Sequence, residues 1–468
     1  MGEADVRSGT AVDGAADRRE RTFRLGLLTV VVLAAVVRIL FSFTIAVDLP
    51  TGMDSDTYES TARALTEGHG FQFRPADLRL LSAKEDPERL VPSIAHPPFQ
   101  SAFLASLRLV GLDSWNAFRA IFSILDALAV GATALLGRRI AGRRVGLLAG
   151  LIAALHPIWF QAAGFAASEA SFFFLLPIAM LLLHVALERK TVAWGIAAGA
   201  AAGLTALDRS EAALLMGLFV ILAFVFGGTG RHRLLLAAAV VLSGLLVVAP
   251  WLIHVKRTTG ELTLSTNAGV TLVGSNCDAT YYGVDLGTFG RTCDVLGSVM
   301  TVSLARPKNL DQGHIDGYND RALRKVGQRY IRDHKGRLPT VLAARLLRTA
   351  GLFRIDHSID FDESIGAHGP TQRVGFVVNW VLMPLAAVGA VLLGRRRSWM
   401  SLSVLGSGVL MTLVTALAVY GATRARISSE PAMAILAAVT VVFLYDRYPR
   451  LTDSSKFGVE HSPDGADH

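Results

Sequence analysis

Long apolar runs separated by short basic clusters form the main pattern of this sequence. Each run is close to the roughly 20 residues that a helix needs to cross a bilayer. Ten such runs lie at about 24–46, 116–137, 144–163, 168–187, 191–207, 211–228, 233–252, 374–394, 399–421 and 430–446. The pattern predicts an all-α polytopic membrane protein with about ten transmembrane helices.

The positions of arginine and lysine predict the orientation of these helices, because positively charged loops are retained in the cytoplasm. Basic clusters precede the first run and follow the second, fourth, sixth, eighth and tenth runs. Both termini are therefore expected in the cytoplasm. The end segments 1–22 and 448–468 are polar and lack an apolar period, so we expect disordered cytoplasmic tails.

Two large hydrophilic segments lie outside the cytoplasm in this topology. The first, 48–115, belongs to an N-terminal transmembrane module of residues 23–253. The second, 254–373, precedes the last transmembrane helices in 374–447, and it holds both cysteines of the chain, Cys277 and Cys293. In an oxidising compartment they could close a disulfide worth on the order of 3 kcal/mol, or remain two unpaired thiols.

The composition supports a membrane protein and argues against a nucleic-acid partner. Hydrophobic residues make up 52% of the chain and charged residues 18%, with a mean hydropathy of +0.44. The net charge is +8, but the basic residues fall in short clusters between apolar runs rather than along one hydrophilic face. We interpret these clusters as topology signals.

The acidic stretch that follows the first apolar run is the main candidate for chemistry. Asp54 lies shortly after that run, so its carboxylate is expected in water at the outer face of the membrane. A base at this height could act on a substrate that a lipid carries. The alternative is that Asp54 and Asp56 only cap the helix that follows them.

An ordered series of motifs between about residues 25 and 446 resembles the GT-C glycosyltransferases, and most closely glycosyltransferase family 39. That family contains the protein O-mannosyltransferases and the bacterial lipid A aminoarabinose transferases. The motifs are Asp54-Ser55-Asp56-Thr57-Tyr58 running into Ala62 to Phe71, His96-Pro97-Pro98-Phe99, Gly146 to Pro157, Ser168-Glu169, Leu204 to Arg209, Pro250-Trp251, and Arg424-Ala425-Arg426 with Glu430-Pro431. The resemblance implies a GT-C fold with two larger extracytoplasmic loop regions.

The resemblance also implies an activity. It points to an inverting glycosyltransferase that moves a sugar from a polyprenyl-phosphate donor to an extracytoplasmic acceptor. In the family the first acidic residue of this loop is the general base, a role that falls here to Asp54. Candidates for holding the acceptor or supporting the base are Asp56, Tyr58, Glu169 and His96.

A leaving phosphate needs positive charge beside it, and several basic residues are expected at the outer boundary. The candidates for phosphate contact are Arg209, Arg424, Arg426, Lys256 and Arg257. Snorkelling towards lipid headgroups would explain such residues equally well. A divalent metal stays open and is not assigned, because the oxygen ligands in view are few: Asp54, Asp56 and Glu169.

Arg38 and Asp126 lie within apolar runs, at a similar depth from the outer ends of antiparallel helices. Charged residues at such depth are costly unless they are paired or face a cavity. We therefore predict a structural ion pair between the first two transmembrane helices.

Two other classes of function remain open. Intramembrane Arg38, Asp126 and His184 would also suit the polar pathway of a transporter or flippase for a polyprenyl-linked substrate. A non-catalytic scaffold for cell-envelope assembly would keep the same fold. In each case we expect a multi-pass protein of a bacterial plasma membrane in contact with membrane lipid. The sugar and the acceptor, whether protein, lipid or polysaccharide, are not identified by the sequence.

Overall fold

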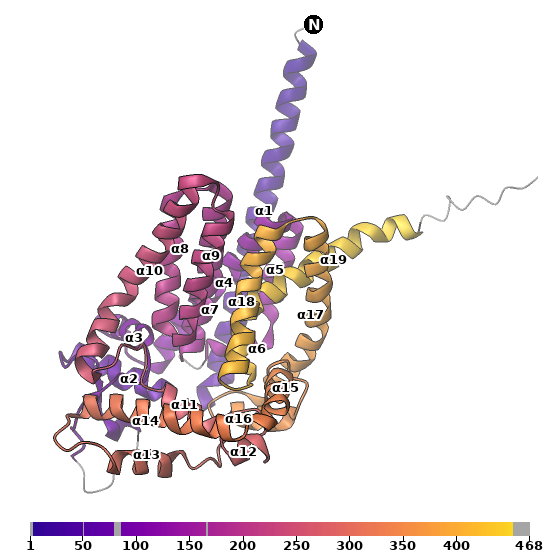
Figure 1. Ribbon diagram of the computed structural model, residues 1–468. Coiled ribbons are helices and arrows are strands. Elements are labelled where there is room, and N and C mark those ends of the chain that lie inside the picture. The colour runs from indigo at the N-terminus through magenta and orange to yellow at the C-terminus, as the bar shows by residue number, and fades with distance from the viewer. Residues whose placement is uncertain (1–2, 50, 79–85, 165–166, 453–468) are drawn as a thin grey trace, which may run out of the picture.

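The computed structural model describes residues 3–49, 51–78, 86–164 and 167–452, and within them the chain is mainly helical (Figure 1). The strands in this part of the chain form a two-stranded antiparallel sheet of β1 (Gln72–Phe73) and β2 (Val91–Pro92). The predicted all-α fold class is confirmed.

Within the described residues, seven helices are long and apolar enough to cross a membrane. They are α1 (Glu3–Thr44), α4 (Trp115–Ala141), α7 (Ser168–Arg189), α10 (Gly230–Thr259), α17 (Gly369–Arg395), α18 (Trp399–Ala418) and α19 (Glu430–Thr452). The other predicted runs form shorter helices, α5 (Arg143–Leu155) with α6 (Pro157–Ala162), α8 (Val192–Asp208) and α9 (Ala213–Phe226). Every predicted apolar run is therefore helical.

The first helix is longer than the sequence predicted. Because α1 begins at Glu3, most of the segment for which we expected a disordered tail is helical and continuous with the first apolar run. Ion pairs one turn apart, such as Arg21 with Asp17 at 2.9 Å, favour the helix at this end. At the other end α19 continues to Thr452, and residues 453–468 of the second predicted tail lie outside the described residues.

The third apolar run is broken at His156-Pro157. Proline has no N–H to donate to the carbonyl four residues earlier, so α5 ends at Leu155 and α6 starts at Pro157. The carbonyl that Pro157 leaves unpaired belongs to Ala153, and it accepts a hydrogen bond from Arg38 at 3.4 Å. A side chain of α1 therefore pairs with the carbonyl group that the break in the third run leaves free.

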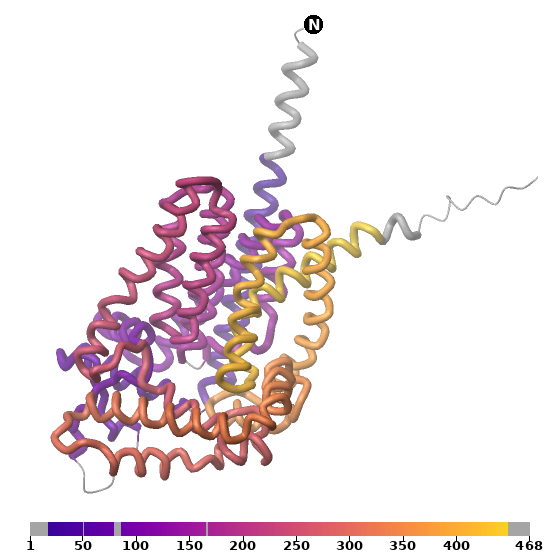
Figure 2. Tube along the Cα trace, in the orientation of Figure 1, coloured from indigo at the N-terminus to yellow at the C-terminus, as the bar shows by residue number. Residues whose placement is uncertain are grey.

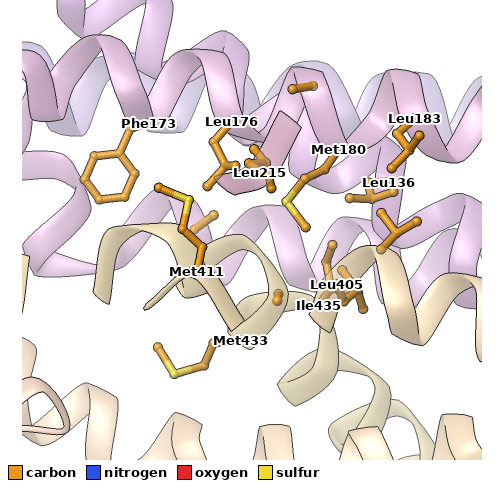
Figure 3. Packing of buried hydrophobic residues seen from close by; sticks show 14 of the residues in the cluster. Leu136, Phe173, Leu176, Met180, Leu183, Leu215, Leu405, Met411, Met433 and Ile435 are labelled. Atoms are coloured by element: carbon orange, nitrogen blue, oxygen red, sulfur yellow. The ribbon is translucent and has the colours of Figure 1, made fainter. Parts of the chain in front are cut away.

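The main hydrophobic core lies between α4, α7, α8, α18 and α19. Figure 3 shows Leu176, Met180 and Leu183 following one another along α7, with Met411 and Leu405 of α18 in the same core. Small residues let helices approach closely: a Cβ added at Gly199 of α8 would lie 2.2 Å from the carbonyl oxygen of Val240 in α10. Large apolar side chains such as Leu246 remain exposed on the outside of the bundle, where lipid would surround them.

The hydrophilic segments gather at one end of the helix bundle, which we call the loop face (Figures 1 and 2). It comprises residues 53–78, 86–109 and 260–368, so the described parts of the two predicted loop regions share one side. Its helices are α2 (Met53–Thr66), α3 (Phe99–Leu109), α11 (Ala268–Gly274), α12 (Asp278–Tyr281), α13 (Val295–Leu304), α14 (Gln312–Asp333), α15 (Leu338–Thr349) and α16 (Ile355–Glu363).

Short 3-10 turns occur between helices of the bundle and of the loop face, and a disulfide and a helix cap stabilise the loop face. The turns are η1 (Ala46–Asp48), η2 (Pro75–Leu78), η3 (Ser210–Ala212), η4 (Lys335–Arg337) and η5 (Thr423–Ser429). Cys277 and Cys293 are joined in a disulfide. Asp311 caps α14 by accepting a hydrogen bond from the backbone of His314 at 2.9 Å.

Candidate active site

A cavity lies where α7, α17 and α19 begin, next to the loop face, and with the solvent at its mouth it encloses about 850 Å³ of space. Its polar lining residues are Asp54, Ser55, Gln161, Glu169, Asp362, Gln372, Thr423, Arg424 and Glu430. Apolar side chains, including Ile158, Phe173 and Ile427, complete the wall. The cavity therefore combines a polar region with an apolar one at the boundary of the predicted membrane spans.

Asp54 lies in the first turn of α2 and faces this cavity. The helix starts directly after Gly52, where an added Cβ would lie 2.9 Å from the carbonyl oxygen of Ile365. The Asp54 carboxylate has an Oδ2 atom 3.8 Å from Arg424 Nη2 and an Oδ1 atom 3.6 Å from His96 Nε2. Gly52, and not an aspartate, is the N-cap residue of α2, so capping does not account for this carboxylate.

Arg424 connects Asp54 with a second carboxylate. Its Nε atom lies 3.4 Å from Glu169 Oε1, and the same Glu169 oxygen lies 2.8 Å from Arg209 Nη1. Arg209 in turn contacts Glu211, with Nε 2.7 Å from Oε1. Alternating positive and negative side chains therefore hold Arg424 in place beside Asp54.

The lining is more acidic than the sequence suggested. Among the described residues that line the cavity, four carry carboxylates, Asp54, Glu169, Asp362 and Glu430, whereas Arg424 carries a guanidinium. An anionic group that enters must therefore meet Arg424, because the carboxylates repel it.

The remaining predicted phosphate contacts do not line the cavity. Arg209 is engaged by Glu169 and Glu211, as described above. Arg426 is buried, with Nε 2.8 Å from Glu430 Oε1 and Nη1 donating to the Thr349 carbonyl at 3.2 Å. Lys256 donates to the Gly260 carbonyl at the end of α10, and Arg257 is exposed beside it. The five predicted cations are thus not gathered into one pocket.

The predicted acceptor residues are arranged around Asp54 in different ways. Glu169 lines the cavity and His96 contacts Asp54, whereas Asp56 is outside the lining. Tyr58 packs edge to face on His96, with ring centroids 5.2 Å apart. Burial, with the negative charge of Asp54, raises the pKa of Tyr58 well above its usual value, so the phenol stays protonated.

The cavity also contains polar residues that the sequence did not single out. Asp362 of α16 is buried and accepts a hydrogen bond from the Thr423 hydroxyl. Burial raises the pKa of Asp362 to about 6. Gln161 and Gln372 come from α6 and α17. Each lies near the end of a predicted apolar run, and this position was the one sign in the sequence that it could face the cavity. No local pattern shows that these two helix ends meet.

Arg38 and Asp126 lie together in the bundle interior. Arg38 Nε is 3.8 Å from Asp126 Oδ2, and both side chains are buried. Arg38 also donates to the carbonyl oxygens of Ala34 at 3.3 Å, Ala154 at 3.2 Å and Ala153 at 3.4 Å. Over the part of the chain that the structure describes, no group of three or more His, Cys, Asp or Glu residues is arranged to hold a metal ion.

Comparisons with known proteins agree with this architecture. Residues 95–254 match the family model of dolichyl-phosphate-mannose-protein mannosyltransferases. None of the curated proteins matches the sequence. Among solved structures, the fold is similar to oligosaccharyltransferase AglB from the archaeon Archaeoglobus fulgidus, in complex with an inhibitory peptide and a dolichol-phosphate. The identity is 15% and the TM-score 0.54, over 91% of this chain and 51% of that chain.

Two further structures are similar. The Archaeoglobus fulgidus oligosaccharyltransferase in the apo form matches with 15% identity and a TM-score of 0.55, again over 91% of this chain and 51% of the other. ArnT from Cupriavidus metallidurans bound to undecaprenyl phosphate has 16% identity and a TM-score of 0.40, over 89% of this chain and 78% of that one.

The fold is therefore that of the GT-C membrane glycosyltransferases, as the motif series predicted. The protein is a multi-pass membrane protein. It spans about half the length of the archaeal oligosaccharyltransferase that it matches.

Proposed function

We propose that this protein is an inverting glycosyltransferase that moves a sugar from a polyprenyl-phosphate donor to an acceptor outside the cytoplasm. The observation that carries the proposal is the position of Asp54 and Arg424, 3.8 Å apart on one cavity at the ends of the membrane helices. This transfer requires a base for the acceptor and a cation for the leaving phosphate within reach of the same sugar ring, and these two side chains supply both. The bound dolichol-phosphate and peptide of the archaeal enzyme support a lipid-linked donor and a separate acceptor.

The chemistry follows from these positions. Arg424 binds the donor phosphate, while the apolar wall of Ile158, Phe173 and Ile427 receives the first part of the prenyl chain. The acceptor nucleophile attacks the anomeric carbon from the side opposite the phosphate, and Asp54 takes its proton. The bond from the anomeric carbon to the phosphate oxygen breaks, and the phosphate leaves with the electron pair. The configuration inverts without a covalent sugar–enzyme intermediate.

Glu169 and Arg209 keep Arg424 available for the phosphate. Glu169 holds Arg424 from one side and is itself held by Arg209 at 2.8 Å, so the guanidinium does not depend on Asp54 alone. When the phosphate binds Arg424, Asp54 is released to accept the proton. No divalent ion is part of this proposal.

The proposal includes the orientation of the chain. We infer that the loop face lies outside the cytoplasm of a bacterial plasma membrane and that both termini lie inside, in keeping with the distribution of basic residues. The transporter and scaffold alternatives are not favoured, because the fold is similar to that of a glycosyltransferase and the cavity contains a base beside an anion-binding group.

Substitutions of Asp54 and Arg424 test the mechanism. In Asp54→Asn we expect sugar transfer from undecaprenyl-phosphate mannose or arabinose to fall by about 10²–10⁴-fold, since the base is lost. Binding of undecaprenyl phosphate should be unchanged. In Arg424→Gln we expect that binding to weaken about 10–100-fold, because a charge-assisted hydrogen bond is removed.

The matched control is Asp48→Asn, an exposed aspartate near the end of the first span and outside the cavity lining. It should leave both transfer and binding unchanged. Transfer is followed with labelled sugar, and lipid binding by native mass spectrometry of the purified full-length protein. An Asp54→Asn variant that keeps most of its transfer activity would contradict the proposed mechanism.

A further inference from the structure

Three of the polar side chains that line the cavity and take no part in the mechanism above each carry an atom that is unpaired among the described residues. They are Gln161 of α6, Gln372 of α17 and Glu430 of α19. Their exposed fractions are 1%, 5% and 2% respectively. Fully buried polar groups are normally paired, so each needs a reason to be present.

Each of the three has one polar atom that no other group satisfies. Within the part of the chain that the structure describes, Gln161 Nε2, Gln372 Oε1 and Glu430 Oε2 have no hydrogen-bond partner. Glu430 Oε2 lies 3.7 Å from His156 Nε2, which is beyond hydrogen-bond distance. Three unpaired atoms on the walls of one cavity indicate a ligand that pairs with them.

In two of these side chains the second polar atom already has a hydrogen-bond partner. That partner determines whether the unpaired atom is a donor or an acceptor. Gln161 Oε1 accepts from the backbone N–H of His368 at 3.3 Å, so its amide NH₂ group is the part left over. Glu430 Oε1 accepts from Arg426 Nε at 2.8 Å, which leaves Oε2 as an acceptor. With Gln372 Oε1, the set consists of one donor and two acceptors.

This combination selects among the parts of the donor lipid. A phosphate has only acceptor oxygens at neutral pH, so it could pair with Gln161 alone and would be repelled by Glu430. A prenyl chain could pair with none of the three. A hydroxyl both donates and accepts, so neighbouring hydroxyls on a sugar ring can satisfy all three atoms.

We propose that Gln161, Gln372 and Glu430 form a subsite that binds the hydroxyl groups of the transferred sugar. The inference rests on the proposed function, because it assigns the sugar of the same donor to this part of the cavity. Arg424 then holds the phosphate, and these three residues determine which glycosyl group is accepted. They are positioning and specificity residues for the donor.

The test compares lipids with and without a sugar in the absence of an acceptor. Gln161→Met and Gln372→Met nearly preserve volume and remove the hydrogen-bonding groups. The affinity of the full-length protein is measured for undecaprenyl phosphate, undecaprenyl-phosphate mannose and undecaprenyl-phosphate arabinose. We expect each variant to bind the preferred sugar-bearing lipid roughly five- to tenfold more weakly, with the affinity for bare undecaprenyl phosphate unchanged.

Gln100→Met is the matched control. Gln100 is also fully buried, but it lies outside the cavity lining and accepts a hydrogen bond from Ser171 at 2.7 Å. Its substitution is expected to lower the unfolding temperature and to leave the affinities for both kinds of lipid unchanged. It thereby separates a general loss of packing from a loss of sugar recognition.

The other outcomes overturn the subsite in distinguishable ways. An equal loss of affinity for bare and sugar-bearing lipids means that Gln161 and Gln372 are structural. Unchanged donor affinity with a raised KM for the acceptor means that the hydroxyls belong to the acceptor. A wild-type protein that binds none of these lipids contradicts the proposed function itself, and the subsite with it.

Discussion

The buried pair of Arg38 and Asp126 allows a quantitative prediction about stability. Arg38 is replaced by methionine and Asp126 by leucine, singly and together, so that the double variant has an apolar pair of similar size. Removing one partner leaves the other charge in the bundle interior, whereas removing both leaves none. We therefore expect each single variant to be less stable than the double variant.

The magnitude follows from the geometry. Two unit charges 3.8 Å apart at an effective dielectric constant of about 20 attract by about 4 kcal/mol. Among the described residues, neither carboxylate oxygen of Asp126 has a hydrogen-bond partner, whereas Arg38 donates to three carbonyl groups. Arg38→Met should therefore cost more than Asp126→Leu, with the larger loss about 3–5 kcal/mol.

The assay is equilibrium unfolding of the full-length protein in mixed micelles, followed by tryptophan fluorescence. The coupling energy of the double-mutant cycle should be about 3–4 kcal/mol. The control cycle uses Ser42→Ala and Ser123→Ala, a buried neutral pair on the same two helices with hydroxyl oxygens 3.2 Å apart. Its coupling should be about 1 kcal/mol. A charged-pair coupling no larger than that of the serines would refute the reasoning.

Two further predictions concern the loop face. Burial raises the pKa of Asp362 to about 6, so its contribution to stability is fully present below pH about 4 and is lost as the pH rises through about 6. Asp362→Asn should abolish this loss, on the order of 2 kcal/mol between pH 4.5 and 7.5, in unfolding measured at those two pH values, and an unchanged pH dependence would contradict the assignment. Replacing Cys277 and Cys293 by serine should lower the unfolding free energy by about 3 kcal/mol, as their separation of 16 residues predicts. A reducing agent should match that loss in the wild type and have no effect on the variant.

The transmembrane architecture could be predicted from the sequence because each apolar run carries its own signal. The sequence also allowed the prediction that Asp54, Glu169 and Arg424 lie close together, because helix ends at one membrane boundary lie at the same height. Gln161 and Asp362 could not be found in this way. Which helix ends become neighbours depends on the packing of the whole bundle, and no local pattern records it.

Two neighbouring arginines show most clearly what the sequence could not predict. Arg424 and Arg426 were both candidates for phosphate contact, and both lie in η5, a 3-10 turn with three residues per turn. Residues two positions apart in such a turn point in different directions, so Arg424 lines the cavity while Arg426 is buried against Glu430. Lys256 and Arg257 belong to α10, which continues to Thr259, beyond its predicted end at 252.

The cavity draws its walls from residues as early as Gly52 and as late as Glu430. These segments are synthesised at different times, because a chain emerges from the ribosome and enters the membrane from the N-terminus onward. A half-made chain exposes Asp54 but has no Arg424 to receive an anion. On the proposed mechanism, the newly made protein cannot bind the donor phosphate until Arg424 has joined the cavity, and we expect a chain that ends before position 423 to be inactive rather than weakened.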